Sequence, residues 1–111
     1  MQSRTQASLE DVYRSAMSVR SVLKGVSLDQ YLANIEKQAA IERFFIVIGE
    51  ALVRIRDREP VVFEAISDAP DIIRFRNLLV HGYDGVHAPT VYELAHQSLD
   101  QLISDVEKLL S

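Results

Sequence analysis

Residues 35–58 read IEKQAAIERFFIVIGEALVRIRDR, and this stretch decides the fold. Its apolar residues recur at helical spacing in two neighbouring stripes. The first stripe comprises Ile35, Ala39, Phe45, Leu52 and Ile55, and the second comprises Ile41, Phe44, Ile48 and Ala51. A helix that is apolar on two sides must be covered on two sides. The segment is therefore either the central helix of a bundle or a helix shared between the core and a subunit interface.

The run FIVI at 45–48 has the composition of a buried strand. However, good helix formers flank it on both sides, and no turn residue separates them from it, so a helix is the better interpretation. Gly49 and Ala51 form a small-residue step at which another helix could approach closely.

The rest of the chain repeats the helical spacing, and the sequence contains only four Gly and three Pro. Gly25 and Gly82 are placed to end helices, Ser27 and Gln30 form a capping-box pair, and Pro60 interrupts the chain. No strand is required. We predict an all-α fold, an antiparallel bundle of four main helices plus short helices, with helices at about 5–24, after Ser27, 35–58, 61–68, 70–81 and from Pro89 onward.

Length and composition exclude several classes of protein. The chain has 111 residues, which corresponds to one domain over residues 1–111. Because it has no Cys, it cannot form a disulfide framework, a thiolate metal site or a Cys nucleophile. The longest apolar run, Phe44 to Gly49, is far shorter than the ~20 residues of a membrane helix, and no apolar signal core is present. We expect an intracellular, cytoplasmic protein without a membrane segment.

The net charge of −4 is unevenly distributed. The excess of acid lies entirely in residues 84–111, whereas residues 43–83 balance six acids with six arginines and contain no Lys. The planar guanidinium suits phosphate or carboxylate, so this set is compatible with oxyanion recognition. The alternative is an ordinary solvated helix surface with neighbouring ion pairs.

Residues 74–83, RFRNLLVHGY, contain a guanidinium, a carboxamide, an imidazole and a phenol, the polar groups best suited to catalysis. Asn77 and His81 share one helix face, whereas Arg76 and His81 lie about 140° apart on an ideal helix. Arg76 and His81 converge only if the helix end unwinds at Gly82 or if their side chains reach into one groove. Arg and His together are sufficient for RNA cleavage, in which His transfers protons and Arg stabilises charge on phosphorus. In a structural interpretation, Arg76 instead pairs with an acid and His81 caps the helix.

The spacing of the three histidines does not favour a zinc site, and we expect neither a metal nor a cofactor.

The order Arg76-Asn77-x-x-x-His81-Gly82-Tyr83 resembles the R-x4-H-x-Y motif of the HepT-like family, part of the HEPN superfamily of small α-helical ribonucleases. The segments AIER at 40–43 and IGEA at 48–51 resemble the central helix of that family. The resemblance covers roughly residues 8–110.

The resemblance implies roles for five residues. Arg76 and His81 match the catalytic pair of a metal-independent endoribonuclease, and Asn77 matches a supporting polar position. Tyr83 matches the tyrosine that a partner minimal nucleotidyltransferase (MNT) antitoxin modifies with AMP in a type VII toxin–antitoxin system. Glu50 matches a recurrent family residue that either lies near the site or only packs. The family also implies a homodimer whose two motifs face one cleft, with RNA as the substrate.

Three hypotheses follow. The first is a ribonuclease toxin controlled by AMPylation. The second is a non-catalytic nucleotide-binding or adaptor subunit that serves a nucleotidyltransferase. The third is a structural helical protein, in which substitutions within residues 74–83 would change stability alone.

Overall fold

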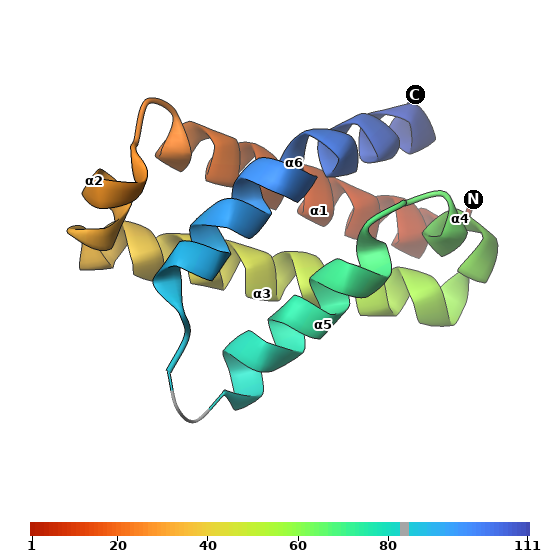
Figure 1. The fold of residues 1–111 in the computed structure, drawn as a ribbon. Helices are drawn as coiled ribbons and strands as arrows, with labels where there is room; N and C mark the ends of the chain where they lie inside the picture. Colours follow the sequence, from red (N-terminus) through yellow and green to blue (C-terminus); the bar gives the residue numbers. More distant parts are fainter. Residues whose placement is uncertain (83–84) are drawn as a thin grey trace.

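The chain folds into helices connected by short segments, as a computed structural model describes for residues 1–82 and 85–111 (Figure 1). In this described part, the elements are α1 (Ser3–Leu23), α2 (Leu28–Leu32), α3 (Ile35–Arg58), α4 (Pro60–Glu64), α5 (Ala69–His81) and α6 (Ala88–Leu110). Each long helix runs roughly antiparallel to the next long helix along the chain (Figure 1). The predicted all-α antiparallel bundle of four main helices plus short ones is confirmed.

Helix α3 lies at the centre of the bundle and contacts all five other helices. It begins where the Asn34 side chain accepts a hydrogen bond from the Lys37 amide at 3.0 Å, and it ends before Pro60. Helices α1 and α5 both pack on it extensively. The chain itself therefore covers the two apolar sides of α3, and of the two predicted arrangements the structure has the central helix of a bundle.

The predicted first stripe of α3 is wrong at its N-terminal end. Ile35 is 79% exposed and Ala39 is also exposed, whereas the covered face begins at Ile41. Helical spacing extends a stripe along the whole helix, but burial depends on how far the neighbouring helices reach. The buried residues of α3 are Ile41, Phe45, Ile48, Gly49, Ala51, Leu52 and Ile55.

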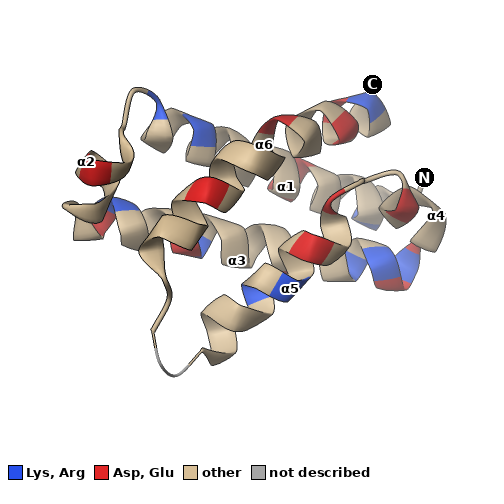
Figure 2. Ribbon diagram, viewed as in Figure 1, with Lys and Arg blue, Asp and Glu red and all other residues tan. Residues whose placement is uncertain are grey.

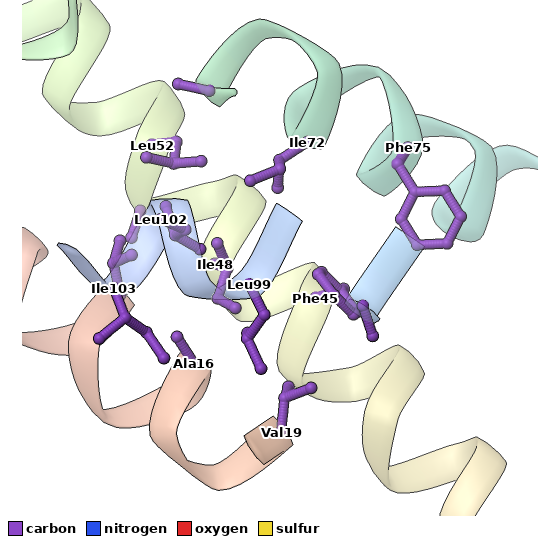
Figure 3. Close-up of a cluster of buried hydrophobic side chains, with 14 of the residues drawn as sticks. Ala16, Val19, Phe45, Ile48, Leu52, Ile72, Phe75, Leu99, Leu102 and Ile103 are labelled. Atoms are coloured by element: carbon purple, nitrogen blue, oxygen red, sulfur yellow. The ribbon is translucent and has the colours of Figure 1, made fainter. Parts of the chain in front are cut away.

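One continuous apolar core joins the four long helices. Figure 3 shows side chains from all four converging on α3, where the aromatic rings of Phe45 and Phe75 meet edge to face with centroids 5.6 Å apart. The residues labelled there are Ala16, Val19, Phe45, Ile48, Leu52, Ile72, Phe75, Leu99, Leu102 and Ile103. This shared core fixes α5, and therefore the Arg76 segment, against α3.

The short helices depend on local hydrogen bonds. The predicted capping box of α2 is present, because the Gln30 amide donates to Ser27 Oγ at 3.1 Å and the Ser27 amide donates to Gln30 Oε1 at 2.8 Å. Helix α4 ends at Glu64, four residues before the predicted end at 68. After Glu64 the backbone hydrogen bonds join residues three apart, and the Ile66 amide donates to the Phe63 carbonyl. This tighter turn places Ile66 in the core.

No helix in the described residues combines the length and the apolar character that a membrane crossing requires.

Two matched substitutions in α3 test this account of the core. We expect Ile48→Ala to lower the free energy of unfolding by about 2 to 5 kcal/mol, because Ile48 is fully buried. Ile35→Ala is the same chemical change at an exposed position and should alter that free energy by less than about 0.5 kcal/mol. Urea denaturation followed by circular dichroism measures both, and equal losses would contradict the assigned burial.

Candidate functional site

Arg76 lies where α5 crosses α3, directly over Gly49. A Cβ atom added to Gly49 would stand within 2.5 Å of the Arg76 Cγ, so only glycine leaves room for the aliphatic part of this arginine. The Arg76 side chain is 24% exposed, with its stem against α3 and its guanidinium at the edge of the interface. The small-residue step predicted at Gly49 is therefore confirmed as a close helix contact.

The Arg76 guanidinium has few polar partners, and its ion pair is long. One of its terminal nitrogens donates to Asn77 Oδ1 at 2.9 Å, and the other lies 3.7 Å from Glu50 Oε1. Its Nε is buried, with no hydrogen-bond partner in the described part of the chain. A half-exposed ion pair of this kind contributes about 0.2 to 1 kcal/mol, so packing on Gly49 orients Arg76 more than pairing does.

Three of the predicted site residues therefore gather at one point. Arg76, Asn77 and Glu50 are in contact, and Glu50 lies beside the candidate arginine rather than packing elsewhere. The structural interpretation predicts that Arg76 pairs with an acid. The structure contains this ion pair, with Glu50, at the long distance of 3.7 Å. Because this pairing is weak, it leaves the guanidinium able to meet another anion.

His81 does not join this group. It is the last residue of α5 and is exposed, and no hydrogen bond or ion pair links it to Arg76 in the described residues. The helix does not unwind before Gly82, whose amide donates to the Leu78 carbonyl at 2.7 Å. A side chain at 82 would meet that carbonyl oxygen at 2.5 Å, which explains the glycine there. Arg76 and His81 are five residues apart on a regular helix, so within one chain their side chains leave the helix about 140° apart.

Most of the other arginines in the central segment are engaged with acids. Arg54 donates to Asp11 and Arg56 to Asp57, at 3.3 and 3.2 Å, and Arg74 pairs with Asp71. For these three, the structure supports the solvated helix surface with ion pairs. Arg43 and Arg58 are exposed and have no ion pair in the described part of the chain, whereas Arg76 is packed on Gly49.

The second half of α5 carries no formal charge. Figure 2 shows blue and red residues in the first part of this helix and only uncharged ones toward its end. Charged residues in the first part include Asp71, Arg74 and Arg76, and residues 77–82 contain none. An anion approaching the exposed end of α5 therefore meets the imidazole of His81 without a carboxylate beside it on that helix.

Tyr83, the predicted AMP acceptor, lies outside the described residues. Within the described ranges, no group of three or more metal-ligating side chains lies close enough together to hold a metal ion.

Sequence reasoning missed two features of this region. It flagged Gly49 for close approach without linking it to Arg76, although both fall in the segments that carry the family resemblance. It also left out Leu78 and His87, which line a cavity beside the end of α5. Leu78 is 67% exposed, and its position three residues before His81 was the available signal.

The profile of the family described as Ribonuclease HepT-like matches residues 12–109 of the chain. No curated protein and no solved structure matches the chain significantly.

The contact between Gly49 and Arg76 can be tested by a double-mutant cycle. Gly49→Ala alone should lower the free energy of unfolding by about 1 to 3 kcal/mol, because overpacking outweighs the better helix propensity of Ala. In an Arg76→Gly background the crowding atoms are gone, and the same change should stabilise by up to about 1 kcal/mol. Urea midpoints measure both steps. If Gly49→Ala stabilises the protein in both backgrounds, the close contact is absent.

Proposed function

The chain belongs to the HepT-like ribonuclease family, within the HEPN superfamily, and from this premise we propose that it is an endoribonuclease toxin that uses Arg76 and His81 on RNA. The observation that carries the proposal is the family match, which spans residues 12–109 and so includes the whole Arg76–His81 segment. A weakly paired arginine and an exposed histidine on the same helix support it.

The proposed reaction is a transesterification within the RNA strand. The 2′-hydroxyl of one nucleotide forms a bond to the adjacent phosphorus as the bond from phosphorus to the 5′-oxygen breaks, which yields a 2′,3′-cyclic phosphate and a free 5′-hydroxyl. The imidazole of His81 accepts the proton of the 2′-hydroxyl and then supplies a proton to the leaving 5′-oxygen. Arg76 stabilises the extra negative charge on the phosphoryl oxygens. Because the nucleophile is internal, the reaction needs neither a metal-activated water nor a cofactor.

A second copy of the chain would complete the site. One chain presents Arg76 and His81 in different directions. A homodimer with its two motifs facing one cleft brings the Arg76 of each copy toward the His81 of the other, so the cleft holds two Arg–His sites. The two apolar sides of α3 do not support this dimer, because α1 and α5 of the same chain cover them. The proposal rests on the directions of Arg76 and His81.

We also propose control by a cognate minimal nucleotidyltransferase, in a type VII toxin–antitoxin pair that acts in the cytoplasm. Tyr83 follows His81 by two residues in the sequence, so the chain itself limits how far a nucleotide attached there can lie from the acid–base group. The adduct adds a phosphate and a bulky nucleoside, which would repel and obstruct RNA at the end of α5.

Cleavage assays test the catalytic assignment. Arg76→Ala and His81→Ala should each lower the rate of RNA cleavage by about 100- to 10,000-fold, the range for a lost acid–base or charge-stabilising group. Arg74→Ala is the matched control, because Arg74 is exposed on the same helix and pairs with Asp71. Cleavage should persist in EDTA. If Arg76→Ala and His81→Ala both cleave at the wild-type rate, the catalytic assignment is wrong. If the wild-type protein cleaves no RNA, the adaptor interpretation replaces the ribonuclease.

Mass spectrometry tests the modification. Incubation of the chain with its nucleotidyltransferase and ATP should add AMP in steps of about 329 Da. Tyr83→Phe should abolish the adduct, whereas Tyr92→Phe, the control, should retain it, because the Tyr92 hydroxyl already donates to the Val26 carbonyl at 2.6 Å. An adduct that persists on Tyr83→Phe would place the modification elsewhere.

A further inference from the structure

A cavity of about 300 Å³ opens beside the end of α5, between that helix and the start of α6. Gly82, the neighbour of His81 in the chain, forms part of its wall, together with Leu78 on α5 and with Val86 and His87 ahead of α6. No Lys, Arg, Asp or Glu of the described residues lines it. The cavity is therefore next to the proposed acid–base group, and its described lining residues carry no formal charge.

The floor of the cavity is apolar and fixed. Phe75 is buried there, and its ring is held edge to face against Phe45 of α3 (Figure 3). Leu78 also lines the cavity and is 67% exposed, a large aliphatic side chain left uncovered three residues before His81. Residues at this spacing are neighbours on a helix surface, so a ligand against Leu78 also stands near the imidazole of His81.

His87 supplies the polar group of the cavity. Its Nδ1 lies 2.7 Å from Oγ1 of Thr90 in the first turn of α6, and this hydrogen bond anchors the ring. Nε2 is the ring atom left for a ligand, and the face of the imidazole is available for stacking because His87 is exposed.

These features together select a class of ligand. An aromatic floor, an aliphatic wall and one anchored imidazole suit a flat heterocycle with hydrogen-bonding edges. They do not suit a phosphate, which would meet no cation among the described lining residues. The volume of the cavity is at the lower end for ligand sites, which limits it to a single small group. Unstacked bases of single-stranded RNA are held in this way, on aromatic or imidazole faces with contacts to their edges.

We propose that this cavity, the base pocket, holds one unpaired nucleobase of the RNA next to the phosphate that Arg76 and His81 handle. This inference rests on the proposed ribonuclease function and adds its substrate class, which is single-stranded RNA with a preferred base beside the cleavage point. A paired base cannot enter, because it must leave the helical stack to reach Leu78 and His87.

Binding of uncleavable RNA tests the base pocket without relying on catalysis. The probes are hexanucleotides of adenosine, cytidine or uridine with 2′-O-methyl groups, which remove the nucleophile, and an abasic hexamer of the same charge. We expect the wild-type protein to prefer one base and to bind the abasic hexamer least. His87→Ala should weaken binding of the preferred hexamer by about 5- to 150-fold, the loss of one base stack.

Two further variants sharpen the result. His96→Ala removes another exposed histidine of the same chain, one whose ring is tilted against Tyr92 and which lines a different cavity, and should leave the affinities unchanged. His87→Phe retains a stacking face without the ring nitrogens, so it should recover affinity and lose the preference between bases. Thermal melts check that each variant is folded.

The outcomes separate this inference from the proposed function. If the protein cleaves RNA but His87→Ala binds every hexamer as the wild type does, the base pocket is overturned and the ribonuclease stands. If no RNA is cleaved but binding depends on the base and on His87, the base pocket stands and the catalytic proposal fails. Equal binding of abasic and base-bearing hexamers overturns the base pocket in either case.

Discussion

The contact between the stem of Arg76 and Gly49 determines the geometry of the whole site. It sets how closely α5 approaches α3 and points the guanidinium toward Glu50 at the edge of that interface. Because α5 remains helical to His81, fixing Arg76 in this direction also fixes His81 in another. One close helix contact therefore explains both why the arginine is well placed and why a single chain does not assemble the pair.

The acidic net charge of −4 is compatible with RNA as a substrate once the charges are located. Arg54, Arg56 and Arg74 each pair with a nearby carboxylate, which leaves fewer free cations for a broad phosphate-binding surface. In the proposed function, recognition depends on few positioned groups: Arg76 for the phosphate, His81 for proton transfer, and the base pocket beside them for a base. The proposal therefore favours a short single-stranded segment over a duplex held along its backbone.

The sequence predicted the fold closely because helix spacing, the Ser27–Gln30 capping box and Pro60 act locally. The predicted burial of Ile35 is wrong, because burial there depends on where the neighbouring helices end, and a local sequence pattern does not contain that information. The motif located Arg76 and His81, and Gly49 signalled a close contact. The direction of the guanidinium and its pairing with Glu50 depend on how α5 crosses α3, and the cavity at His87 depends on how the chain returns into α6. The spacing of residues along the sequence does not predict these tertiary features.

The central claim is that Arg76 of one copy works with His81 of another, and mixing two inactive variants tests it most directly. Arg76→Ala and His81→Ala proteins, unfolded together and refolded as a mixture, should form mixed dimers in which one of the two sites is intact. Cleavage should recover to about a quarter of the wild-type rate with random pairing, although each variant alone is inactive. A mixture that remains as inactive as its components, while native mass spectrometry detects mixed dimers, would contradict the claim.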